Sequence, residues 1–131
     1  IDKEPFREKE IMKGHICHIE IPADNLGSLQ KFYGGLFDWN YEKAPGDFEY
    51  FGIKHGDEKP MAGMMTRQHP EQKPLFYVCV DSAEKAVEEA EGLGATVIVP
   101  RTPVRGYGWF AVLMDPQNNP FGLWQEDAKA A

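Results

Sequence analysis

The sequence lacks a long apolar run and has no excess of basic residues. Its longest apolar runs, residues 76–80 and 109–114, hold five and six residues, whereas a helix needs about 20 to cross a bilayer. Fourteen Lys and Arg stand against 21 Asp and Glu, a net charge of −7. Such a charge repels the phosphate backbone of a nucleic acid. We therefore expect neither a membrane nor a nucleic acid as partner.

The chain is also too short for two ordinary domains. Its 131 residues, 42% of them hydrophobic, suffice for one sizeable core. Residues 1–13 are rich in charges of both signs and lack the apolar stretch of a secretion signal. We interpret them as a solvated N-terminal arm, and we expect a cytoplasmic protein with one domain over residues 14–127.

Hydrophobic periodicity divides that domain into two similar halves. Each half begins with a strand, a capped helix and a second strand, and two more strands follow; Gly34-Gly35 and Gly92 mark the expected helix ends. The predicted strands are 16–22, 39–41, 48–54, 61–65, 76–80, 96–99, 109–114 and 121–125, and the helices are 26–36 and 83–90. We predict an α+β fold of two βαβββ modules, about 14–68 and 74–127. Packed side by side, they would form a cup-shaped, curved mixed sheet with the helices outside.

Three motifs carry a resemblance to a known family. They are the run from His18 to Asp24, the segment Phe-Tyr-Gly-Gly-Leu-Phe-Asp-Trp at 32–39, and the turn Asp-Pro-Gln-Asn-Asn at 115–119. Over about residues 14–126 the chain resembles the vicinal oxygen chelate superfamily of glyoxalases, bleomycin-resistance proteins and extradiol dioxygenases. The resemblance implies the same paired βαβββ modules. In the turn, Asn118 stands where relatives usually carry a glycine with positive φ, and Asn tolerates that geometry.

The resemblance also implies a four-ligand metal pattern, of which this chain keeps one member. Metal-binding relatives carry a His on the first strand of each module and a Glu on the last. Here the positions are His18, Leu75, Gly63 and Gly122. A catalytic metal usually needs three protein ligands, so we expect neither a metal nor another cofactor. An alternative donor set of His18 with Glu20 and Glu126 remains open.

Strand alternation predicts which side chains face the cup. Residues two apart share a face, so the neighbours of the four family positions are expected to line it. The predicted ligand-binding residues are His18, Glu20, Met61, Gly63, Met65, Leu75, Tyr77, Gly122 and Trp124. The two glycines are expected to enlarge this mostly apolar cavity, which suits a flat or aromatic small molecule. The alternative is that the same side chains fill a collapsed core.

The same alternation separates the two cysteines. It places Cys17 on the helix side and Cys79 in the cup, so we predict that they form no disulfide, as in a reducing compartment. The Pro- and Gly-rich residues 100–109 are predicted to be a connector. Its Arg105 is either solvated or paired with an anionic ligand at the rim.

Four functions fit these features. The first is metal-free binding of a small hydrophobic or aromatic molecule. The second is an enzyme in which His18 acts as general acid or base and Glu20 orients it. The third is a glyoxalase-type lyase or isomerase with a divalent metal, and the fourth is a structural partner domain. A homodimer is compatible with each of them.

Overall fold

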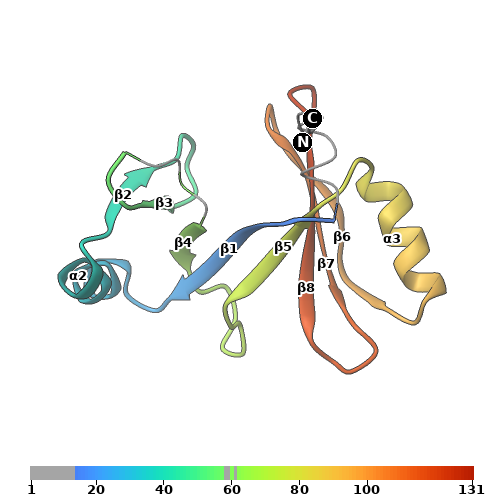
Figure 1. Ribbon diagram of the computed structural model, residues 1–131, viewed down its shortest axis with the longest axis horizontal. Helices are drawn as coiled ribbons and strands as arrows, with labels where there is room; N and C mark the ends of the chain where they lie inside the picture. Colours follow the sequence, from blue (N-terminus) through green and yellow to red (C-terminus); the bar gives the residue numbers. More distant parts are fainter. Residues whose placement is uncertain (1–13, 58–59, 61) are drawn as a thin grey trace, which may run out of the picture. The chain divides into compact units, whose positions relative to one another are not determined.

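The computed structural model describes residues 14–57, 60 and 62–131, which form two compact units (Figure 1). We call His18–Leu75 the N-terminal unit, and Phe76–Ala131 together with residues 14–17 the C-terminal unit. The strands Ile16–Ala23 and Leu75–Cys79 cross these boundaries, and each is described with the unit that holds most of it. The predicted N-terminal arm, residues 1–13, and Met61 lie outside the described residues.

The N-terminal unit contains one helix and four strands. Its elements are β1 (Ile16–Ala23), α2 (Leu26–Phe37), β2 (Asn40–Lys43), β3 (Tyr50–Lys54) and β4 (Ala62–Thr66). The strand order is β2-β3-β4-β1; β1 and β4 are parallel and the other pairs are antiparallel. Asn25 caps α2 by accepting a hydrogen bond from the Ser28 N–H at 2.9 Å.

The C-terminal unit repeats this topology. Its elements are β5 (Leu75–Cys79), α3 (Ala83–Gly92), β6 (Thr96–Val104), β7 (Gly108–Met114) and β8 (Pro120–Glu126). The strand order is β5-β8-β7-β6, with β5 and β8 parallel and the other pairs antiparallel. Helix α3 runs along one face of this sheet (Figure 1). The two βαβββ modules and the α+β class are confirmed, whereas the cup between the modules stays a prediction.

Each unit has its own core between its helix and its sheet. In the N-terminal unit, Ala23, Ile53 and Met64 are buried against side chains of α2. In the C-terminal unit the buried residues are Ala111, Leu113 and Leu123, packed against α3. Because side chains alternate along a strand, the neighbours of these residues lie on the sheet face opposite the helix.

Three local predictions can be compared with the structure. Helix α2 ends at Phe37, one residue past its predicted end, and Asp38 rather than Gly34 or Gly35 supplies the left-handed cap, with a φ of 60°. Residues 100–104 are not a connector, because β6 extends to Val104. Strand β6 is an edge strand, where prolines are tolerated. Asn118 has the expected positive φ of 67°.

Neither helix of the described residues is long and apolar enough to cross a membrane. This agrees with the shortness of the apolar runs in the sequence.

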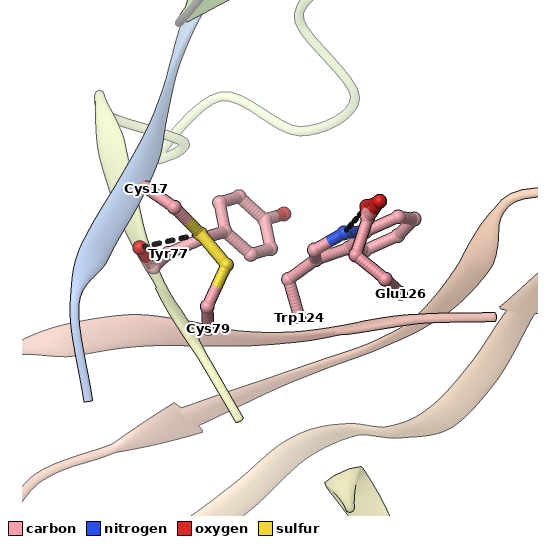
Figure 2. Close-up of a disulfide and its surroundings, with 5 residues drawn as sticks. All are labelled: Cys17, Tyr77, Cys79, Trp124 and Glu126. Carbon is pink, nitrogen blue, oxygen red and sulfur yellow. Dashed lines mark hydrogen bonds between the residues drawn. A yellow bond between two sulfur atoms is a disulfide. The ribbon is translucent and has the colours of Figure 1, made fainter. Parts of the chain in front are cut away.

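The prediction that the cysteines stay apart is wrong, since Cys17 and Cys79 form a disulfide (Figure 2). The segment at Gly14 and His15 is hydrogen-bonded to Cys79: the Gly14 N–H donates to the Cys79 carbonyl at 2.8 Å, and the Cys79 N–H donates to the His15 carbonyl at 2.9 Å. This pairing brings the Cα atoms of Cys17 and Cys79 to 6.0 Å, within the usual range for a disulfide. The prediction failed because alternation within each strand does not specify the register between strands. The cysteines no longer support a reducing compartment.

We predict that the disulfide stabilises the protein substantially. It joins residues 62 apart and closes a loop around the whole N-terminal unit, so the chain-entropy model gives about 4 kcal/mol. The double variant Cys17→Ser with Cys79→Ala should lower the free energy of unfolding, measured in urea, by about 2 to 4 kcal/mol. Reduced wild-type protein should match the variant. Equal stability of reduced and oxidised wild type would contradict the prediction.

Candidate functional site

A chain of hydrogen bonds joins His18, Tyr50 and Glu20 in the N-terminal unit. The His18 Nε2 lies 2.5 Å from the Tyr50 hydroxyl oxygen, and that hydroxyl donates to Glu20 Oε2 at 3.0 Å. A phenol has one proton to donate. With that proton directed to Glu20, the hydrogen bond between Tyr50 and His18 is one in which Nε2 donates to the phenol oxygen.

Burial lowers the pKa of His18 below its ordinary value of 6.5. Removal from water disfavours the charged imidazolium, so the ring is neutral at pH 7. The neutral His18 ring is thus linked through the Tyr50 hydroxyl to the carboxylate of Glu20.

Tyr50 is the member of this hydrogen-bond chain that the sequence analysis did not predict, because strand alternation within β1 relates only His18 and Glu20. It belongs to β3, and the register pairs it with Met65 of β4. The same register puts Gly52 opposite Gly63, and Gly63 opposite Glu20. Tyr50, Gly63, Met65 and Glu20 therefore share the sheet face opposite α2.

The Tyr50 ring lies over Gly63, where a Cβ atom would overlap the ring and its hydroxyl. The C-terminal unit has an equivalent arrangement, because the Tyr77 ring lies over Gly122, its register partner. The prediction that these glycines enlarge a cavity is therefore wrong. Each glycine makes room for an aromatic ring of its own unit.

The remaining predicted site residues of the C-terminal unit lie on β5 and β8. Cys79 and Trp124 are register partners, as are Tyr77 and Gly122, so all four share the face opposite α3. The Trp124 indole N–H donates to Glu126 Oε2 at 2.6 Å (Figure 2). Glu126 is the last residue of β8 and was considered above only as a metal donor. Leu75, the first residue of β5, is half-buried.

A hollow of about 310 Å³ opens near the end of β8. We call it the C-terminal hollow. It is lined by Gly106, Tyr107, Trp124, Glu126, Asp127 and Ala128. Only Trp124 was among the predicted ligand-binding residues. Tyr107 and Asp127 were missed because they lie in turns that follow β6 and β8, where strand alternation says nothing about side-chain direction.

The residues at the family's metal positions do not fit a metal ion. Leu75, Gly63 and Gly122 carry no side-chain donor, and His18 is hydrogen-bonded to a phenol. Among residues 14–57, 60 and 62–131, no three His, Cys, Asp or Glu side chains are placed to hold a metal. The donor set therefore falls short of the usual three protein ligands.

Comparison with known proteins identifies the family. The model of the glyoxalase-like domain matches residues 18–124, and the chain belongs to this family. No curated protein sequence matches the chain.

Solved structures share the fold at low sequence identity. A hypothetical protein, BH1468 from Bacillus halodurans, is 15% identical with a TM-score of 0.65, over 88% of this chain and 96% of that one. A methylmalonyl-CoA epimerase from Streptomyces coelicolor is 12% identical with a TM-score of 0.65, over 91% and 99%. The 2,3-dioxygenase LapB from Pseudomonas sp. KL28 is 15% identical with a TM-score of 0.60, over 98% of this chain and 48% of that one. These likenesses establish the glyoxalase-like fold.

We predict that His18 makes the protein less stable as the pH falls. The unfolded imidazole titrates near 6.5 and the folded one at a lower pKa. Between these two values the unfolded chain binds a proton that the folded chain does not, so the free energy of unfolding decreases with falling pH. Urea titrations from pH 7.5 downward should show this decrease, and His18→Gln should make it smaller.

The matched control is His55→Gln, at an exposed histidine of the same unit. It should keep the wild-type pH dependence. If His18→Gln leaves the dependence unchanged, burial of the His18 ring is not its source.

Proposed function

We propose that this protein binds a small aromatic or hydrophobic molecule without the help of a metal ion. The observation that carries the proposal is the C-terminal hollow, walled by Trp124 and Tyr107. Small-molecule sites are typically concave and rich in aromatic side chains, with a few polar groups that orient the ligand. Glu126 and Asp127 supply such groups here.

The predicted lining residues of the cup remain part of this proposal. Those within the described residues are His18, Glu20, Gly63, Met65, Leu75, Tyr77, Gly122 and Trp124. Their proposed role in ligand binding is supported by the strand register, which puts the residues of each unit that it pairs on the sheet face opposite the helix. Tyr50, which the hydrogen-bond chain adds to them, brings one more phenol to that face.

The absence of donors at the family's metal positions supports binding without a metal. Leu75 has no donor atom, and Gly63 and Gly122 are each covered by a tyrosine ring, so none of the three can act as a metal ligand in place of His or Glu. We therefore expect the affinity for an aromatic ligand to be the same in EDTA and in zinc-supplemented buffer.

A binding screen tests the proposal directly. Titration with a panel of substituted benzenes and naphthalenes should quench tryptophan fluorescence for at least one member, and calorimetry should confirm saturation. Trp124→Leu should weaken that binding by about tenfold or more, because an indole at the wall of a binding site is a typical anchor for an aromatic ligand.

The matched control is Trp39→Phe, which removes an indole from the N-terminal unit and keeps an aromatic ring beside Tyr33. Its affinity should equal that of the wild type. If no panel member binds, or if Trp124→Leu binds as tightly as the wild type, the proposed site is wrong.

A second candidate function is proton transfer by His18. The observation that favours it is the hydrogen-bond chain through Tyr50 to Glu20, which positions a neutral imidazole. A positioned acid or base of this kind contributes about 10²-fold or more to a rate. The imidazole, the phenol and the carboxylate are all groups that take part in acid–base catalysis.

This second function predicts turnover of a small molecule at His18, independently of binding at the C-terminal hollow. Proton NMR of the panel compounds should show conversion of at least one by the wild type and a rate slower by about 10²-fold or more for His18→Ala. Tyr50→Phe keeps the imidazole and removes its link to Glu20, so an intermediate rate is expected. If His18→Ala converts the ligand as fast as the wild type, His18 is not the catalyst.

A further inference from the structure

The C-terminal unit contains two indoles whose N–H groups donate to carboxylates. Trp109 donates to Asp127 Oδ2 at 2.9 Å, and Trp124 donates to Glu126 Oε2 at 2.6 Å (Figure 2). A carboxylate at the N–H edge polarises an indole and adds to the negative potential of its ring face. Both indoles are therefore suited to hold a cation.

At Trp109 the protein supplies that cation itself. The guanidinium carbon of Arg101 lies 4.0 Å from the centre of the Trp109 ring. Arg101 on β6 and Trp109 on β7 belong to neighbouring antiparallel strands, and the register pairs Pro103 with Trp109. The set of cation, ring and carboxylate is thus complete within the chain.

At Trp124 the corresponding place is a hollow. Among the described residues, the cation–ring contact is that of Arg101 with Trp109, and it does not involve Trp124. The Trp124 ring packs over Gly108 with its six-membered edge and borders the C-terminal hollow together with Tyr107. Tyr107 is 56% exposed, so its ring is open to a ligand.

The two carboxylates at the hollow, Asp127 and Glu126, differ in how far neighbouring groups already stabilise their negative charge. Hydrogen bonds from Trp109 and from the backbone N–H of Lys129 lower the pKa of Asp127, and the Lys129 charge adds to this effect. The exposed Glu126 is held by the neutral indole of Trp124. Arg105 lies next to the hollow in sequence and is exposed. Glu126 is therefore the carboxylate best placed to pair with a charge from outside.

We propose that the C-terminal hollow selects organic cations, namely ligands that carry an alkylammonium or quaternary ammonium group on an aromatic skeleton. The aromatic part lies against Trp124 and Tyr107, and the ammonium group lies at Glu126. This inference rests on the proposed binding of an aromatic molecule at the hollow and adds the sign of the ligand's charge. The net charge of −7 favours the approach of such ligands over long distances.

Three probes with one skeleton test the charge preference. They are 2-phenylethylammonium, 2-phenylethanol and 3-phenylpropionate, which carry a positive, a neutral and a negative group on the same phenylethyl unit. Affinities are measured by saturation-transfer NMR at low salt. The cation should bind about tenfold more tightly than the alcohol, and the anion should bind more weakly than both.

Two variants of matched charge locate the preference. Glu126→Gln should bring the affinity for the cation to within about threefold of that for the alcohol, with the alcohol unchanged. Glu88→Gln removes the same charge from an exposed position on α3 and should keep the preference. The preference should also shrink in about 0.5 M salt, where charges at the surface are screened.

The possible failures are distinguishable. If the three probes bind alike, or if Glu126→Gln keeps the full preference, the cation site is wrong while binding of aromatic molecules at the hollow stands. If Glu88→Gln and Glu126→Gln reduce the preference equally, the overall charge of the protein causes it and the cation site is again wrong. If none of the three binds up to its solubility, both the cation site and binding at the hollow are overturned.

Discussion

The packing of a tyrosine ring over a glycine, once in each unit, is the constraint on which the candidate site depends. Tyr50 reaches His18 and Glu20 because Gly63 beneath it has no side chain, and Tyr77 covers Gly122 in the same way. A carboxylate side chain at either glycine would need the space that the ring fills. The same packing therefore accounts both for the lack of carboxylate side chains at Gly63 and Gly122 and for the position of the two phenols.

Hydrophobic periodicity was enough to predict the fold. Buried residues such as Met64 and Leu123 alternate with residues of the opposite face, and both predicted helices are capped, by Asn25 and by Ser82. These features are local, because period and capping depend on residues a few positions apart. The same local reading placed Trp124 on the face of Tyr77, and the register agrees.

The features that the sequence did not reveal depend on partners far along the chain. The disulfide depends on the hydrogen bonds of Gly14 and His15 with Cys79, which bring Cys17 and Cys79 together although they are 62 residues apart. Likewise, Tyr50 joins His18 through the pairing of β3 with β4 and of β4 with β1. Alternation along one strand does not specify the register between two strands that are distant in the sequence.

The two indoles of the C-terminal unit, Trp109 and Trp124, each donate a hydrogen bond to a carboxylate but lie in different surroundings. Register pairs Trp109 with Gln125 and Phe110 with Trp124, so Trp109 and Trp124 point to opposite faces of the β7–β8 hairpin. Consecutive carboxylates, Asp127 and Glu126, then each accept from the indole on one face. On the Trp109 face an arginine completes the arrangement and contributes to folding. On the Trp124 face lies the C-terminal hollow, where we propose that the cation of a ligand takes the corresponding place.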